Sequence, residues 1–300
     1  MNFITFSDLY IYYYLHNEIL TGVSVGNSST FILANLSSFY NTKIIGLTGS
    51  DIQSKIVLND LKRLNIDASL VKQEDRSTSC LFISNKQSTT CPYCNRTYSN
   101  DINLDELYIL DNIRPLDNII LDNLDDFTIS LLPSLSNDIY LDLGFIGNLR
   151  YKSLEELKDL NGKFKVINMD VKVYTYLRDK FKIDYMDIYN IFNPSILIIY
   201  KGIHGADFIY DDIFDDKTVI DKTLVVDSTG SRETFFATFI HLYISNNYKL
   251  DDKFISESFI SSFAESLYVS SLVGGLTHLI PLNKVINYKE CICKDIEVNI

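Results

Sequence analysis

Residues 225–244, VVDSTGSRETFFATFIHLYI, place polar and charged groups between two apolar stretches. An apolar strand end leads into a short turn, and a helical pattern is expected to begin at about Thr234. A strand, a small polar turn and a helix N-terminus form an anion site, because free backbone N–H groups point outward there. The chemistry that these residue types predict is therefore the binding or transfer of a phosphate group. The turn consists of Asp227, Ser228, Thr229, Gly230, Ser231, Arg232 and Glu233.

The elements that would position this turn alternate between strand and helix periodicity. Such alternation predicts an α/β domain with a mainly parallel sheet and helices on both faces, with ligands at the carboxyl ends of the strands. We expect one domain over residues 1–300, with a lid excursion around 80–105. The predicted strands are 1–15, 42–49, 80–84, 118–123, 138–144, 164–170 and a strand–glycine–strand unit at 195–210. The predicted helices are 29–40 capped by Ser28 or Ser29, 51–65, 153–162, 173–181, 184–192, about 234–244, and 253–275.

The bulk composition indicates which kinds of binding partner to expect. A formal net charge of −12 disfavours nucleic acid, since neutralising phosphates needs clustered Lys and Arg, but a local site can still bind a small anion. No basic, cleavable leader and no apolar run of about 20 residues is visible, so we expect a cytoplasmic protein without a membrane span. Its five cysteines are then expected to be reduced.

Four segments, in this order and spacing, make the chain resemble the ribokinase/PfkB family of carbohydrate kinases over nearly its whole length. The segment 25–71 is similar to that family's N-terminal signature, and 225–244 to its C-terminal D-T-T-G-A-G-D-x-F signature. INMD (167–170) is similar to its N-x-x-E motif, and IYKGIHGADFIY (199–210) to its strand–glycine–strand unit. The resemblance implies a ribokinase-like three-layer sandwich with a mainly parallel central sheet and a small lid. It also implies ATP-dependent phosphotransfer, with Mg²⁺, to a hydroxyl of a sugar or nucleoside-like molecule.

The resemblance places the catalytic base at Glu233, where the family has a shorter Asp, and the anion turn at Gly230, Ser231 and Arg232. The added methylene displaces the carboxylate, and a misplacement of ~1 Å can cost ~10²-fold in rate. Arg232 replaces a glycine. It fits poorly if its backbone needs a positive φ, and otherwise its guanidinium could clamp a phosphate.

The remaining family positions also differ in part. The early substrate-binding Asp falls on Tyr12, and the N-x-x-E glutamate falls on Val171, which leaves Asp170 as the nearest carboxylate. The residues that the resemblance assigns to the substrate are Asp8, Tyr12, Gly26, Asn27 and Thr30. Those it assigns to the nucleotide and its ion are Asn168, Asp170, Lys201, Gly202, Gly205, Asp227 and Thr229. These departures leave two functions open: an active kinase with unusual chemistry, or an impaired kinase fold that binds a ligand or acts as a scaffold.

The cysteines form a separate candidate site. Cys91 and Cys94 have the C-x-x-C spacing of a zinc knuckle, and structural zinc needs four ligands. Cys291 and Cys293 could complete the set, as could a second copy of the Cys91–Cys94 pair in a homodimer formed through the lid. A redox pair and unrelated reduced thiols are the other interpretations.

Overall fold

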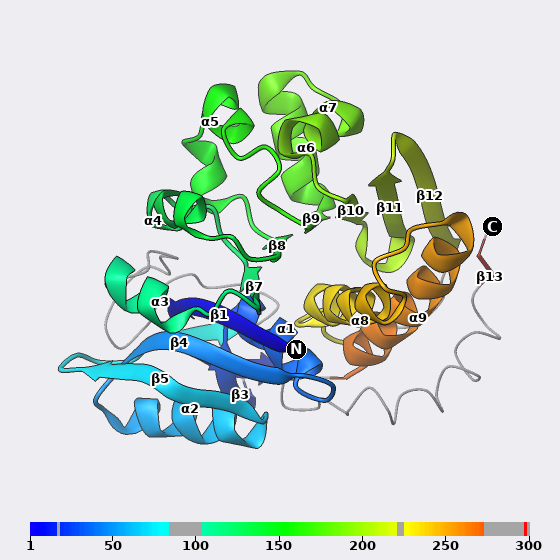
Figure 1. Ribbon diagram of the computed structural model, residues 1–300. Coiled ribbons are helices and arrows are strands. Elements are labelled where there is room, and N and C mark those ends of the chain that lie inside the picture. Colours follow the sequence, from blue (N-terminus) through cyan, green and yellow to red (C-terminus); the bar gives the residue numbers. More distant parts are fainter. Residues whose placement is uncertain (17–18, 84–103, 221–224, 273–296, 299–300) are drawn as a thin grey trace.

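The structure is a computed structural model that describes residues 1–16, 19–83, 104–220, 225–272 and 297–298. Within these ranges one large sheet carries helices on both faces, and a small sheet lies beside it (Figure 1). In sheet order the large sheet contains β13 (Glu297–Val298), β12 (Ile213–Ile220), β11 (Gly205–Tyr210), β10 (Ile196–Tyr200), β9 (Val166–Asp170), β8 (Ile139–Leu143), β7 (Asp117–Leu121), β1 (Asn2–Asp8), β4 (Asn41–Gly49) and β5 (Ile66–Glu74). The strands from β10 to β5 are parallel, and β11, β12 and β13 are antiparallel.

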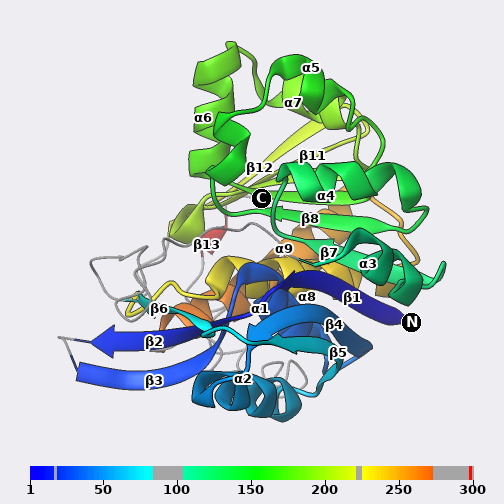
Figure 2. The same ribbon diagram turned by 90° about the vertical axis from the view of Figure 1, so that its left-hand side faces the viewer.

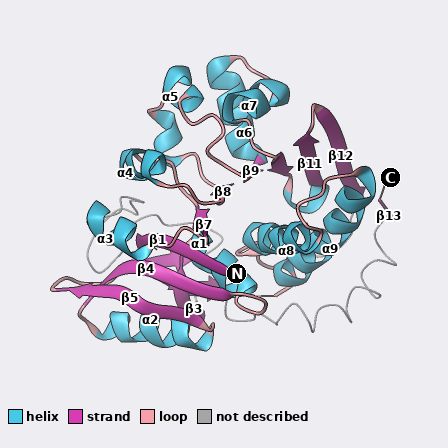
Figure 3. Cartoon of the chain, in the orientation of Figure 1, coloured by secondary structure: helices cyan, strands magenta, loops and turns pink. Residues whose placement is uncertain are grey.

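Two separate cores lie on the two faces of the large sheet. Successive strand residues point to opposite faces, so Ile44 of β4 joins one core and Ile45 joins the other. One face is covered by α1 (Ser28–Leu36), α2 (Ile52–Arg63), α8 (Ser231–Ser245) and α9 (Asp252–Ser270), as Figure 3 shows. The other is covered by α3 (Glu106–Asn112), α4 (Asp126–Leu131), α5 (Leu154–Lys158), α6 (Val171–Phe181) and α7 (Tyr185–Phe192). This arrangement confirms the predicted three-layer α/β sandwich with a mainly parallel central sheet.

The opening segment forms two strands, where the sequence predicted a single strand over residues 1–15. β1 ends at Asp8 in the large sheet, and β2 (Tyr10–His16) pairs with β3 (Ile19–Gly26) and β6 (Ser79–Ile83) in the small sheet (Figure 2). The chain changes sheets at Leu9, whose backbone N–H donates to the carbonyl of Leu47. The apolar pattern runs through this junction because Leu9 itself is buried. Most of the predicted lid, residues 84–103, lies outside the described residues.

The parallel register brings polar residues of neighbouring strands together at their carboxyl ends. Asp142 of β8 lies beside Asn168 of β9, and Asp8 and Asp170 are the last residues of β1 and β9. The N-termini of α1 and α8 lie at the same end, since Ser28 contacts Glu233. None of the helices in the described ranges combines the length and apolarity needed to cross a membrane.

Candidate functional site

The turn before α8 places the predicted anion-binding residues at the N-terminus of that helix. Gly230 has a φ of 83°, a left-handed conformation that glycine adopts freely. The helix begins at Ser231, earlier than the predicted start near Thr234, so Arg232 and Glu233 belong to its first turn. Because the positive φ falls on Gly230, Arg232 has ordinary helical backbone and fits without strain.

Asp227 and Thr229 shape this turn from within. The Asp227 carboxylate accepts hydrogen bonds from the backbone N–H of Thr229 at 2.9 Å and from its hydroxyl at 2.6 Å. The hydroxyl of Ser231 donates to the carbonyl oxygen of Ser228 at 2.8 Å. The backbone N–H of Ser231 also donates to the Ser228 carbonyl at 3.2 Å, so the N–H groups that the helix leaves without an acceptor are those of Arg232 and Glu233.

The guanidinium group of Arg232 makes the densest polar contacts of the site. Its Nε and Nη2 atoms donate to the two carboxylate oxygens of Asp142 at 3.1 and 2.9 Å, a bidentate pair. Nη2 also donates to the hydroxyl of Ser28 at 3.0 Å and to Oε1 of Glu233 at 2.5 Å. The remaining nitrogen, Nη1, has no hydrogen-bond partner among the described residues. The group is therefore anchored on one side and has two N–H donors left over.

Gly144, just after β8, makes room for this guanidinium. A Cβ atom built on Gly144 would lie 1.9 Å from Cζ of Arg232, so the guanidinium rests directly on the glycine backbone. Burial alone would lower the pKa of Arg232, but the carboxylates of Asp142 and Glu233 raise it above its ordinary value. Arg232 is thus a permanently charged group in a largely buried position, with 14% of its side chain exposed.

Asp142 is the fully buried partner of Arg232, with an exposed fraction of 0%. Burial raises its pKa to about 6, although Arg232 and a 2.7 Å hydrogen bond from the amide of Asn168 both oppose that shift. The carboxylate is therefore ionised at neutral pH. Asn168 is also buried, and its Oδ1 atom has no hydrogen-bond partner within the described ranges. Asp142 was not among the residues that the sequence singled out.

Glu233 links α8 to α1. Its Oε1 atom accepts from the hydroxyl of Ser28 at 2.8 Å and from Arg232, while Oε2 has no partner in the described part of the chain. Only 9% of the residue is exposed. One oxygen is thus fixed by hydrogen bonds, and the other is available to accept a hydrogen bond from a bound molecule.

Asn27 occupies the N-terminus of α1 and is engaged structurally. Its Oδ1 atom accepts from the backbone N–H of Thr30 at 2.8 Å, so Asn27 caps the helix, and not Ser28 or Ser29 as predicted. Its amide nitrogen donates to Ser7 at 2.7 Å. Thr30 is buried, and its hydroxyl has no hydrogen-bond partner among the described residues.

The other predicted substrate residues lie nearby on the strands. Asp8 is buried and forms an ion pair with Arg76 at 3.4 Å. The ring of Tyr12 lies over Gly26, because a Cβ atom on Gly26 would be 2.3 Å from ring atoms. This close approach requires glycine at position 26. Tyr12 therefore offers an aromatic ring where the family pattern has a carboxylate.

The residues present do not fit a metal held by the chain beside the N-x-x-E position. Val171 packs against the apolar core of that sheet face, and the Asp170 carboxylate caps α6 by accepting from the backbone N–H of Lys172 at 2.8 Å. Asp142 and Glu233 are engaged with Arg232. Among the residues that the structure describes, no three His, Cys, Asp or Glu side chains group as metal ligands.

The predicted nucleotide-side lysine forms ion pairs within the protein. Lys201 donates to Asp207 at 2.6 Å and to Asp216 at 2.7 Å, and it thereby ties the end of β10 to β11 and β12. Gly202 and Gly205 both have positive φ, at 64° and 101°, and form the turn as predicted. A Cβ atom on Gly205 would lie 1.9 Å from the carbonyl oxygen of Lys217, so this turn needs glycine.

The predicted zinc ligands Cys91, Cys94, Cys291 and Cys293 lie outside the described residues, so the zinc hypothesis stays a prediction. Cys80 is the remaining cysteine, and it is buried in β6 as a free thiol.

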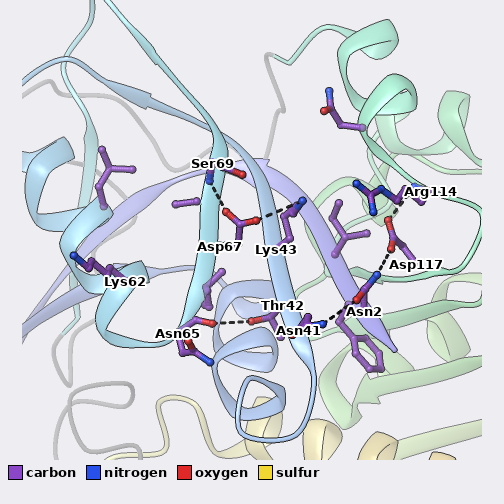
Figure 4. A pocket seen from close by; sticks show the side chains of 16 residues that line it. Asn2, Asn41, Thr42, Lys43, Lys62, Asn65, Asp67, Ser69, Arg114 and Asp117 are labelled. Atoms are coloured by element: carbon purple, nitrogen blue, oxygen red, sulfur yellow. Dashed lines mark hydrogen bonds and ion pairs between the residues drawn. The ribbon is translucent and has the colours of Figure 1, made fainter.

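A cavity of about 680 Å³ lies at the opposite end of the sheet. Its lining includes the first residues of β1, β4 and β5, which are Asn2, Asn41 and Ile66 (Figure 4). Figure 4 shows its carboxylates paired inside the protein: Asp67 with Lys43 at 3.4 Å, and Asp117 with Asn2 at 3.0 Å. The cavity is thus separate from the carboxyl-end site, which holds the unpaired polar atoms described above.

Among solved structures, similarity extends over nearly the full length of the chain. A fructokinase with bound ATP from Xylella fastidiosa superposes with a TM-score of 0.77 at 11% identity, over 97% of this chain and 99% of that one. A ribokinase from Thermotoga maritima gives 0.70 at 13% identity, over 96% and 99%. A nucleoside kinase from Methanocaldococcus jannaschii gives 0.69 at 16% identity, over 97% of both chains. No family model and no curated protein matches the sequence. The chain has the fold of the ribokinase/PfkB sugar and nucleoside kinases.

Proposed function

We propose that this chain transfers a phosphoryl group from ATP to a hydroxyl of a sugar or nucleoside-like molecule. The observation that carries the proposal is the pair of open atoms at the start of α8. Oε2 of Glu233 and Nη1 of Arg232 have no partner among the described residues, while the rest of each group is fixed by hydrogen bonds. A fixed carboxylate beside a fixed cation matches what phosphoryl transfer needs, since catalysis there consists mostly of positioning and charge stabilisation.

Each group then has one role. Oε2 of Glu233 takes the proton of the acceptor hydroxyl as general base. Nη1 of Arg232 and the backbone N–H groups of Arg232 and Glu233 hold the transferred phosphoryl group. The acceptor lies between α1 and α8, near Ser28, because this hydroxyl bridges Glu233 and Arg232. A divalent ion that the nucleotide carries on its own phosphates belongs to the substrate.

The use of ATP is supported by the likeness to a fructokinase solved with ATP and to a riboside kinase from Salmonella enterica solved with an ATP analogue. A sugar or nucleoside acceptor is supported in the same way by the riboside and nucleoside kinases. We further propose a cytoplasmic protein that can pair through its lid.

The test is ADP release from ATP in the presence of a pool of sugars and nucleosides. Glu233→Gln keeps the shape of the side chain and removes the base, so we expect acceptor-dependent release to fall by ~10²–10⁴-fold. Glu265→Gln is the matched control, because Glu265 is equally buried but contacts Thr238 on α8 away from Arg232. Turnover by Glu233→Gln at the wild-type rate would remove Glu233 from the mechanism.

A second candidate function is ligand binding without transfer. Two observations favour it: Asp142 and Glu233 together neutralise Arg232, and Val171 packs against an apolar core where the family pattern has a carboxylate. Both candidate functions require that ATP binds, so thermal unfolding in the presence of ATP tests whether the binding site exists. Ligand at ~100 times its dissociation constant stabilises the native state by ~2.7 kcal/mol. A shift in melting temperature without acceptor-dependent ADP release supports binding alone.

A further inference from the structure

Arg232 lies at the centre of an acidic constellation. Asp142 and Glu233 bond it directly. The carboxylate of Asp170 also raises its pKa, and Arg232 in turn opposes the rise that burial causes in the pKa of Asp122. Four carboxylates thus act on one guanidinium group. Since like charges repel strongly in a buried site, these carboxylates need a cation among them.

A neutral buried acceptor adds to this constellation. The Oδ1 atom of Asn168 is buried without a hydrogen-bond partner in the described part of the chain, and its amide nitrogen bonds Asp142. Carboxylate and amide oxygens are the ligands that Mg²⁺ and Mn²⁺ prefer. The two carboxylates that bond the guanidinium are therefore ligands of the type that suits a hard divalent cation, and the Asn168 amide holds Asp142 in place.

The guanidinium excludes such an ion by its position. It lies flat against Gly144 and uses both oxygens of Asp142 and one of Glu233. A metal ion that approached those oxygens from the same side would meet the guanidinium, which occupies that space and repels a second cation.

We infer that the Arg232 guanidinium is the resident cation of this site and occupies the place of a divalent ion between Asp142 and Glu233. The inference rests on the proposed function in that it takes this pocket as the phosphate site, but it concerns cation binding and needs no transfer. It predicts that the wild-type chain holds no divalent ion there and that removal of the side chain creates a divalent-cation site.

The experiment titrates Mn²⁺ alone into nucleotide-free protein and follows free Mn²⁺ by electron paramagnetic resonance. Arg232→Ala is expected to bind one Mn²⁺ at least ~10-fold more tightly than the wild type. This margin corresponds to ~1.4 kcal/mol and is below the ~4 kcal/mol between two unit charges 4 Å apart at an effective dielectric of 20. Arg232→Lys keeps the cation and is expected to bind Mn²⁺ as weakly as the wild type.

Two further variants locate the ion and guard against misfolding. Arg232→Ala combined with Asp142→Asn removes a principal ligand, and its Mn²⁺ affinity is expected to return to the wild-type level. If Arg232→Ala is unfolded in metal-free buffer, Mn²⁺ is expected to restore its far-ultraviolet circular dichroism, and Arg232→Gln is titrated alongside as the less disruptive neutral variant.

Mn²⁺ affinity of Arg232→Ala and Arg232→Gln equal to that of the wild type would overturn the inference. The inference would also be overturned if Arg232→Ala bound Mn²⁺ equally tightly with and without the added Asp142→Asn substitution. Because no nucleotide is present, a failure of the proposed transfer reaction does not change any of these outcomes.

Discussion

Replacing Gly144 by alanine tests the packing of the site through one methyl group. The added Cβ would lie 1.9 Å from Cζ and Nη2 of Arg232, whereas ordinary contact begins at 3.4 Å. The guanidinium must therefore retreat by about 1.5 Å, the difference between these distances. Its bonds to Asp142 are 2.9–3.2 Å long, so a retreat of this size disrupts the bidentate pair.

The cost of Gly144→Ala lies between two limits. Simple overpacking of a core costs ~1–3 kcal/mol. Complete loss of one partner of a buried ion pair costs ~3–5 kcal/mol. Because the Arg232 side chain is flexible but anchored by Asp142, we expect a loss of ~2–4 kcal/mol in the free energy of unfolding. Gly144 does not have a positive φ, so backbone strain adds nothing to this value.

The coupling energy between positions 144 and 232 is measured by equilibrium urea unfolding of four proteins. These are the wild type, Gly144→Ala, Arg232→Ala and the double variant. In the Arg232→Ala background the guanidinium is gone, and Gly144→Ala is expected to be neutral or to stabilise by ~0.4–1 kcal/mol through the unfolded state. An equal cost of Gly144→Ala in both backgrounds would refute the placement of the guanidinium on Gly144.

Two further predictions concern charges at and near the site. Burial raises the pKa of Asp142 to about 6, so its carboxyl group binds a proton more tightly in the native state than in the unfolded state. The stabilisation of the native state by this protonation is therefore lost as the pH rises from about 4 to 6. The wild type should thus lose stability relative to Asp142→Asn across this window in urea titrations, and a constant difference would contradict the assignment. Lys201→Met leaves Asp207 and Asp216 without their shared cation and should cost ~1 kcal/mol, with no change in the ATP-induced shift of melting temperature. Lys253→Met at an exposed site is the control and should stay within ~0.5 kcal/mol.

The sequence predicted the layers of the fold because its strands are short, buried and separated by amphipathic helices. The regular alternation also gave the correct end for β4 at Gly49. Periodicity failed where a chain changes sheets without a polar break, as at Leu9, which is buried and continues the apolar pattern. It also failed at the start of α8, since Arg232 and Glu233 interrupt the apolar pattern although their backbone is already helical.

The candidate site was predictable only where a local motif carried it. Glu233, Arg232 and Gly230 followed from one contiguous segment and lie together at the start of α8. Asp142 and Gly144 were missed because their role depends on Arg232, which lies about 90 residues further along the chain. One local signal was available: Asp142 is an acidic residue within the apolar strand β8, and a buried carboxylate needs a partner.

The departures from the family pattern at positions 171 and 232 are better understood together than singly. The sequence treats them as two separate losses, because one removes a carboxylate and the other replaces a glycine of the anion turn. In the structure Asp170, the neighbour of Val171, acts electrostatically on Arg232, so both positions affect one pocket. Loss of a carboxylate and gain of a guanidinium both make that pocket less negative. The guanidinium is largely buried, forms a bidentate pair and is seated on Gly144, so it is held more firmly than a solvated arginine would be. The two positions are therefore coupled in the proposal that Arg232 is the resident cation of this pocket, and the Mn²⁺ titration of Arg232→Ala tests them together.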